Sequence, residues 1–169
     1  FLKKIASKAT KIQAVAVDMG QSYIKAINPT LGHVDIVFDC YHISALVNGA
    51  IDELRRDLQN KLNEKGKAHL KGSKFLFLRN YSNLDDDSKA KSQVLLDRNA
   101  PLFFMYNMKE LLRYFWKFKT ATLAKISLYS WCHDALTSGI KPFMRLGMTL
   151  NKHKNQILNY FKYHITNAA

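Results

Sequence analysis

The chain has 169 residues, 47% of them hydrophobic, which is enough for one domain with a substantial core. Lys and Arg number 26 against 13 Asp and Glu, so the formal net charge is +13 and we expect a polyanionic partner, nucleic acid before an anionic membrane. No apolar run reaches the length of a membrane span, and no Ser-His-Asp spacing or glycine-rich phosphate loop is present, so we expect neither a membrane protein nor a small-molecule substrate.

The first part of the chain alternates between short helices and short strands. Apolar spacing predicts a basic helix over residues 2–10. The run IQAVAV at residues 12–17 predicts a strand buried on both faces, because its apolar residues hardly alternate with polar ones. A short helix closed by Asn28-Pro29 then leads to a second strand, HVDIVF, at residues 33–38.

A strand, a helix and a second strand form a βαβ unit, whose strands should be parallel and joined by a right-handed crossover. In such sheets, ligand-binding groups gather at the carboxyl ends of the strands. Asp18 and Asp39 each follow directly after one of the predicted strands. We therefore expect both aspartates at the same edge of the sheet.

The rest of the chain is predicted to be helical. An apolar stripe that includes Leu46 begins at Ile43 and continues to a stop near Gly66, after which residues 69–80 form a basic connector. Start and stop signals predict further helices over about 83–96, 101–118, 120–137 and 141–163. The signals include the acidic run after Leu84, Pro101, Ser138-Gly139 and Pro142.

The two strand-end aspartates are each open to two interpretations. Asp18 can be a Mg²⁺ ligand, since that ion prefers hard oxygen ligands, or a helix cap or turn residue. Asp39 and His42 can be a metal pair; alternatively Asp39 caps a helix that starts near Tyr41, and His42 packs on the sheet in its first turn. For Asp39 and His42 we favour the cap.

The other candidate groups are weaker. Cys40 and the Cys132-His133 pair match no zinc spacing, so core packing and a reducing cytoplasm are favoured over a metal site or a disulfide. The aromatic run RYFWKF at residues 113–118 is interpreted as core rather than as a base-stacking platform. Basic clusters can be solvated faces or phosphate contacts, and the residues we assign to the DNA backbone are Arg55, Arg56, Lys71 and Lys74.

Five motifs, taken in order, resemble one protein family. They are DMGQSY, FDCYHI, VNGAIDELRR, LKGSKFLFLRN and the segment from SGIKPF to ITNA. This series is similar to the DDE-type transposases of bacterial insertion sequences, in the ISL3 branch. The departures, Cys40-Tyr41 in place of a basic residue and Phe, and Gln156 in place of Gly, touch no catalytic position of that family.

The resemblance implies an α/β fold class: a partial ribonuclease-H-like core with two parallel strands, then a mostly helical insertion. It divides the chain into the core (1–65), the insertion (66–140) and a C-terminal helix (141–169). In the family, three acids hold two divalent ions, Mg²⁺ or Mn²⁺, that promote DNA strand cleavage and transfer. Asp18 would be the second acid and a metal ligand, whereas Asp39 and His42 belong to the signature as structural residues.

The partner implied by the resemblance is double-stranded DNA at transposon ends, in the nucleoid of a bacterial cytoplasm. The family's first acid would precede Phe1 and its third would follow Ala169, and neither Asp85 to Asp87 nor Asp134 should replace them. We therefore expect this chain alone neither to cleave nor to join DNA, and to self-associate through an open sheet edge. The rival interpretation is a non-enzymatic helical DNA-binding or adaptor module; a membrane-surface protein ranks last.

Overall fold

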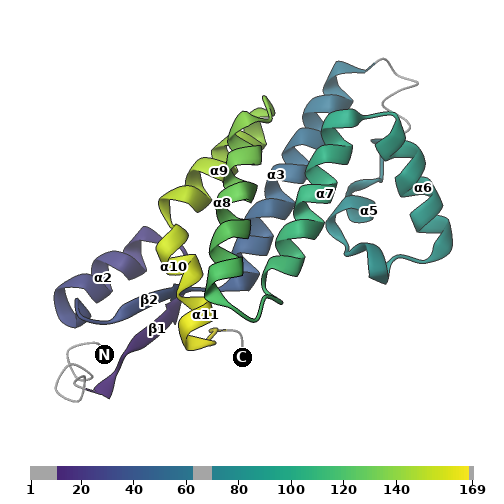
Figure 1. The fold of residues 1–169 in the computed structure, drawn as a ribbon. Coiled ribbons are helices and arrows are strands. Elements are labelled where there is room, and N and C mark those ends of the chain that lie inside the picture. Colours follow the sequence, from purple (N-terminus) through teal and green to yellow (C-terminus); the bar gives the residue numbers. More distant parts are fainter. Residues whose placement is uncertain (1–10, 63–69, 168–169) are drawn as a thin grey trace.

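The strand–helix–strand unit at the start of the chain leads into a layer of helices (Figure 1). The structure, a computed structural model, describes residues 11–62 and 70–167, so the helix predicted over 2–10 lies outside the described residues. The elements are β1 (Ala14–Val17), α2 (Gln21–Leu31), β2 (Asp35–Phe38), α3 (Cys40–Lys61), α5 (Lys74–Leu78), the 3-10 helix η2 (Tyr81–Asn83), α6 (Asp86–Asp97), α7 (Ala100–Phe115), α8 (Ala121–Thr137), α9 (Lys141–Lys152), α10 (Lys154–Leu158) and α11 (Tyr160–Tyr163).

The two strands pair in parallel, as predicted, from Ala14 opposite Asp35 to Val17 opposite Phe38. In the described part of the chain they make a two-stranded sheet. The prediction that β1 is buried on both faces is wrong, since only Val17 is buried and the other three residues of the strand are half-buried. β2 is the better covered strand, because α10 and α11 pack against it.

Helix α2 does not close at Asn28-Pro29 as expected but continues through Pro29 to Leu31. A proline inside a helix removes one backbone hydrogen bond. Ile27 on one side of the proline and Leu31 on the other are both buried in the core. Burial of these two side chains offsets the lost bond, so tertiary packing overrides the local stop signal.

Helix α3 crosses the whole molecule and carries the predicted apolar stripe, with Ile43, Val47, Ile51 and Leu54 buried. Two details differ from the prediction. Leu46 is 41% exposed, and the helix ends at Lys61 rather than near Gly66, because Leu62 adopts an extended conformation. The buried stripe faces α5, α7 and α9, which pack on α3.

The segment between α3 and α7 is more ordered than a connector, since it contains α5 and the predicted helix α6. Asp85 caps α6 by accepting a hydrogen bond from the Ser88 amide at 2.7 Å. The buried amine of Lys109 on α7 donates to the carbonyl oxygens of Phe77 and Arg79 at 2.9 and 2.6 Å. This lysine therefore ties the end of α5 to α7.

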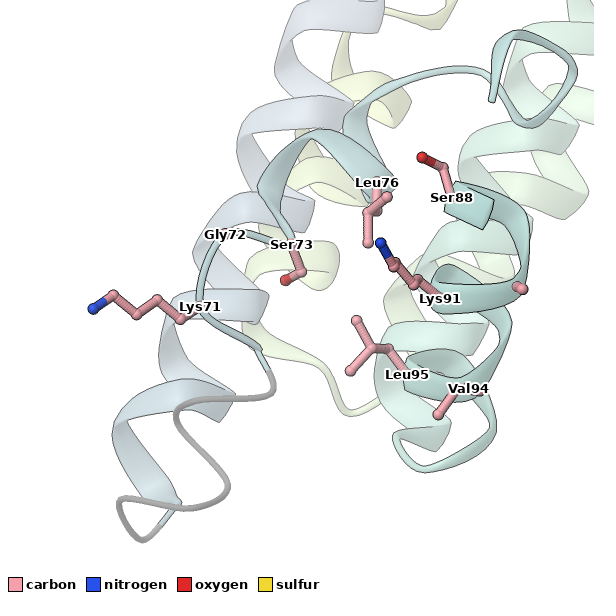
Figure 2. Close-up of a pocket in the computed structure, with 9 residues that line it drawn as sticks. Lys71, Gly72, Ser73, Leu76, Ser88, Lys91, Val94 and Leu95 are labelled. Carbon is pink, nitrogen blue, oxygen red and sulfur yellow. The ribbon is translucent and has the colours of Figure 1, made fainter. Parts of the chain in front are cut away.

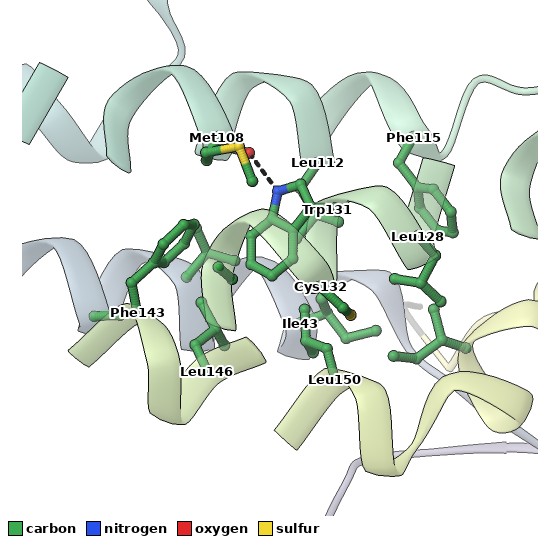
Figure 3. Close-up of a cluster of buried hydrophobic side chains, with 14 of the residues drawn as sticks. Ile43, Met108, Leu112, Phe115, Leu128, Trp131, Cys132, Phe143, Leu146 and Leu150 are labelled. Atoms are coloured by element: carbon green, nitrogen blue, oxygen red, sulfur yellow. Dashed lines mark hydrogen bonds between the residues drawn. The ribbon is translucent and has the colours of Figure 1, made fainter. Parts of the chain in front are cut away.

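The main core lies between α3, α7, α8 and α9 (Figure 3). The indole of Trp131 donates to the Met108 carbonyl at 2.8 Å and stacks edge-on against Phe143. Gly139, at φ +69°, lets the chain reverse between α8 and α9 where a stop was predicted. None of the helices in 11–62 and 70–167 is both long enough and apolar enough to span a membrane.

The last predicted helix, 141–163, is broken into α9, α10 and α11 at His153 and Asn159. At the first break the His153 ring packs edge-on against Phe38 of β2, with the ring centres 5.2 Å apart. The bends turn Ile157 and Phe161 into the core. A straight helix would carry these side chains away from β2, so packing on the sheet decides the break.

We predict that Gly147→Ala destabilises the protein by about 1–3 kcal/mol through overpacking. Gly147 lies on α9 where it crosses α8, and an added Cβ would meet the Ala135 Cβ at 2.9 Å. The matched control is Gly49→Ala on α3, where a Cβ meets nothing within 4 Å and should stabilise the helix by up to about 1 kcal/mol. Urea unfolding of both variants measures the difference, and equal effects would contradict the packing of α8 on α9.

Candidate functional site

The carboxyl ends of β1 and β2 place Asp18 and Asp39 at one edge of the sheet, as predicted. The Asp39 amide donates to the Val17 carbonyl at 3.2 Å, which extends the strand pairing to the end of β1. Asp39 then leaves the strand with φ −65° and ψ 130° and begins α3. The two aspartates therefore start from equivalent positions, but their surroundings differ.

Asp39 is buried and both of its oxygens accept hydrogen bonds. Oδ1 accepts from the Tyr41 amide at 2.6 Å, which confirms the predicted helix cap. Oδ2 accepts from the Thr166 hydroxyl at 2.7 Å and from the Asn167 amide at 3.1 Å. Burial by itself would raise the pKa of the Asp39 carboxyl, but the bonds from Thr166, Tyr41 and Asn167 outweigh it and hold that pKa below its ordinary value.

Asp18 is more accessible, with 31% of its side chain exposed. Its Oδ1 lies 2.6 Å from His42 Nε2 and accepts a hydrogen bond from the Asn167 side-chain amide at 2.8 Å. Among the described residues no donor bonds the other oxygen, Oδ2. His42 was expected to pack on the sheet; in the structure its side chain, 42% exposed, reaches Asp18.

The C-terminal segment of the described chain contributes many contacts to the strands and to this site. These contacts were not predicted from the sequence. Asn159 donates to the Ile36 carbonyl of β2 at 2.9 Å. Tyr163 and Lys162 donate to Asp35 Oδ2 at 2.6 and 2.9 Å, and these bonds lower the pKa of the Asp35 carboxyl. Each bond joins residues more than 120 positions apart. No local pattern could have indicated them.

The acids of this site offer limited room for a metal ion. Both oxygens of Asp39 are engaged by donors, whereas none of the described residues donates to Oδ2 of Asp18, the other carboxylate at the strand ends. Within 11–62 and 70–167, no three His, Cys, Asp or Glu side chains are grouped so that they could hold a metal ion. The described residues therefore fit one carboxylate ligand of a divalent ion, not a complete site.

Three of the four basic residues assigned to DNA lie together around Asp52 of α3. Arg55 is buried and donates to Asp52 at 3.0 Å and to Gln59 at 3.0 Å. Arg56 and Lys74 lie 3.6 and 3.7 Å from the other Asp52 oxygen, with 63% and 48% of their side chains exposed. The Arg55 charge is thus compensated inside the protein, whereas Arg56 and Lys74 still face solvent.

Lys71, the fourth basic residue, borders an open hollow of about 600 Å³ between α5 and α6 (Figure 2). In Figure 2 the Lys71 side chain extends away from the hollow, while Lys91 points into it between Ser88 and Leu76. Leu76 and Leu95 form part of its apolar wall. The hollow thus has a cationic rim, and sequence reasoning found one of its two lysines.

The two thiols have different surroundings. Cys132 is buried in the core, where burial raises the pKa of its thiol to about 11. Burial also raises the pKa of the Cys40 thiol, and the charge of the adjoining Asp39 carboxylate adds to this effect. Both cysteines are free, and core packing is the role the structure gives to Cys132, as favoured from the sequence.

The aromatic run at 113–118 is mainly core, as predicted. Phe115 is buried, and Trp116 and Phe118 pack against the core cluster. Tyr114 differs, because half of it is exposed and the side chains of Arg113 and Lys117 lie over its ring.

Comparison with known proteins decides the family. The family model for the ISL3-type DDE transposases, described as "Transposase", matches residues 1–169. The chain belongs to this transposase family. It is also 31% identical over 153 residues to the transposase for insertion sequence element IS1001 of Bordetella parapertussis.

That alignment covers 89% of this chain but 38% of the IS1001 transposase, so the chain spans well under half the length of this relative. No solved structure matches the chain significantly. The resemblance inferred from the five motifs is therefore confirmed at the level of the transposase family.

We predict that Asp39→Asn destabilises the protein at neutral pH by about 1–3 kcal/mol, because the new amide can still cap α3 but cannot accept the bonds from Thr166 and Asn167. The Asp39 pKa is lower in the folded state, so its contribution to stability is present above about pH 4 and is lost as the pH falls through that lowered pKa.

The difference in stability between Asp39→Asn and the wild type should therefore become smaller at acidic pH. Denaturant unfolding at neutral and acidic pH measures it, and Asp57→Asn, at an exposed position of α3, is the control. A deficit that does not depend on pH, or that Asp57→Asn reproduces, would contradict this role of Asp39.

Proposed function

We propose that this chain is the part of an ISL3 transposase that carries the second catalytic acid, Asp18, in a metal-dependent DNA cleavage and strand-transfer reaction. The proposal is supported mainly by one observation: β1, α3 and the C-terminal segment all contribute residues around the Asp18 carboxylate. Asp18 contacts His42 from the start of α3 and Asn167 from the last described residues. Segments distant in sequence thus converge on one open acid.

A ribonuclease-H-like core is supported by the two sheet edges. The outer edge of β2 is covered by the C-terminal helices, with Asn159 bonded to the Ile36 carbonyl. In the described residues β1 pairs with β2 alone, so its other edge is available to a further strand, or to self-association. We propose that residues 1–65 belong to this core, 66–140 to a helical insertion, and 141–169 to the C-terminal helices that carry the chain back to Asp18.

The chemistry we assign to the site is two-metal phosphodiester cleavage, in which bound Mg²⁺ or Mn²⁺ activates the attacking oxygen and stabilises the leaving one. Asp18 would supply one ligand through its Oδ2. His42 and Asn167 hold Oδ1 and so fix the direction of the carboxylate. Since Mg²⁺ is bound through few carboxylates together with phosphate oxygens, one open acid fits part of such a site.

The proposed DNA surface comprises Arg56 of α3, Lys71 in the turn before α5, and Lys74 of α5, with Lys91 of α6 added. These side chains would neutralise phosphates of transposon-end duplex without reading its sequence. Arg55 contacts Asp52 and Gln59, so in this proposal it orders the surface rather than touching DNA.

The first test is Asp18→Asn in a transposase that contains this segment. We expect strand cleavage to be abolished and DNA affinity to stay within about 2-fold, because a metal ligand is lost while the phosphate contacts remain.

His42→Ala in the same transposase should lower Mn²⁺ affinity about 10- to 100-fold, because it removes the contact that orients Asp18. His42→Gln, which keeps a nitrogen donor at the Nε2 position, should recover most of that affinity.

Cleavage by Asp18→Asn at a near wild-type rate would remove Asp18 from the mechanism. It would favour the rival function, a non-enzymatic DNA-binding or adaptor module, for which the single open carboxylate is the supporting observation. We further expect the 169-residue chain by itself, incubated with Mn²⁺ and DNA, to produce no nicks.

The second test concerns the DNA surface. Affinity for duplex DNA should fall steeply with salt, and Lys71→Ala and Lys74→Ala should each reduce the slope of log K against log salt by about 1. Arg145→Ala is the control, because Arg145 lies on α9, outside the proposed surface, and its guanidinium is paired with Glu53. Slopes that are unchanged in the lysine variants would place the DNA surface elsewhere.

A further inference from the structure

A second hollow, on the helical segment, is lined by aromatic side chains that the proposed function does not use. It lies between η2, α6 and α7 and has a volume of about 380 Å³. The lining residues are Tyr81, Ser82, Gln93, Leu96, Phe103, Tyr106, Asn107, Glu110, Arg113 and Tyr114.

Three of the aromatic residues that line the hollow are exposed. Tyr81, Phe103 and Tyr114 are 43%, 46% and 51% exposed. Exposed apolar groups that gather around one hollow mark a binding surface more often than scattered ones do. The three rings come from two elements, so their meeting is a product of the fold.

Polar side chains line the hollow beside the aromatic rings. The amide side chains of Gln93 and Asn107 and the carboxylate of Glu110 supply donors and acceptors. The Tyr106 side chain also lines the hollow, but it is 4% exposed and its hydroxyl is buried.

Three cations border the hollow, and two of them also have acidic partners, since Arg113 pairs with Glu110 at 2.9 Å and Lys89 with Asp86 at 3.0 Å. The Arg113 guanidinium and the Lys117 amine lie 4.3 and 5.0 Å from the centre of the Tyr114 ring, and the Lys89 amine lies 6.0 Å from that of Tyr81. Aromatic faces flanked by cations are the combination by which proteins hold single-stranded nucleic acid, with bases on the rings and phosphates on the cations.

We propose that this hollow binds an unpaired nucleobase of DNA, with Phe103 and Tyr114 as stacking walls. Duplex DNA cannot enter, because its bases are stacked and their faces are covered. The proposal rests on the proposed function only for its choice of DNA as partner, and it does not involve Asp18.

The test compares an oligothymidylate with the same oligonucleotide made of abasic sugars, which keeps the phosphates and removes the rings. The intact chain should bind the oligothymidylate roughly 5- to 100-fold more tightly. Phe103→Ala and Tyr114→Ala should each reduce this ratio by a factor of roughly 5 or more, whereas Tyr106→Phe, which removes only a buried hydroxyl, should leave it unchanged.

Tyr129→Ala is the matched control. Tyr129 is 43% exposed, lies on α8 outside the hollow, and has the amines of Lys125 and Lys154 near its ring, so only its location differs. This variant should keep the wild-type ratio.

Three outcomes would overturn the proposal: no preference for the oligothymidylate in the intact chain, an equal loss in Tyr129→Ala, or an unchanged ratio in Phe103→Ala and Tyr114→Ala. If duplex and abasic DNA still bind in these cases, the proposed DNA surface remains supported and only the proposed nucleobase site is wrong. If no DNA of any kind binds, the DNA partner of the proposed function fails as well.

Discussion

The carboxylate of Asp39 joins the beginning of the chain to its end. It accepts one hydrogen bond from the first turn of α3 and two from residues 166 and 167, all in a buried position. A buried charge is tolerated only when such bonds compensate for its lost hydration. Every segment that donates to Asp39 is thereby held at the carboxyl ends of the strands, and the candidate site depends on this arrangement.

Asp18 and Asp39 show how surroundings divide two equivalent residues into different roles. Both follow a strand of the same parallel pair. Both oxygens of Asp39 accept hydrogen bonds from the protein, so it stabilises the fold. Asp18 is bonded through one oxygen, to His42 and Asn167, and its partial exposure leaves the other accessible to a ligand. The division matches the assignment of catalysis to Asp18 in the proposed function.

Not every basic residue that contributes to the net charge is available to bind DNA. Asp52 compensates Arg55, and Glu110 lies between Lys109 and Arg113 at 3.1 and 2.9 Å. Lys109 is buried and serves the packing of α5 on α7. The cations that remain available to phosphates are those on exposed helix faces and around the two hollows of the helical segment.

Local signals in the sequence were sufficient for the parallel strands, the cap at Asp39, and the helix boundaries at Asp85, Pro101 and Ser138-Gly139. The cap and the helix boundaries each depend on residues within a few positions of one another, so a short stretch specifies them. The parallel pairing follows from two apolar runs joined by one short helix, a βαβ unit. The course of α2 through Pro29 and the break at His153 were decided by burial of side chains on the strands and core. The contacts of His42 and Asn167 with Asp18, the inward Lys109 and the aromatic hollow likewise required the fold, because their partners come from separate elements and no spacing along the chain encodes which of them meet.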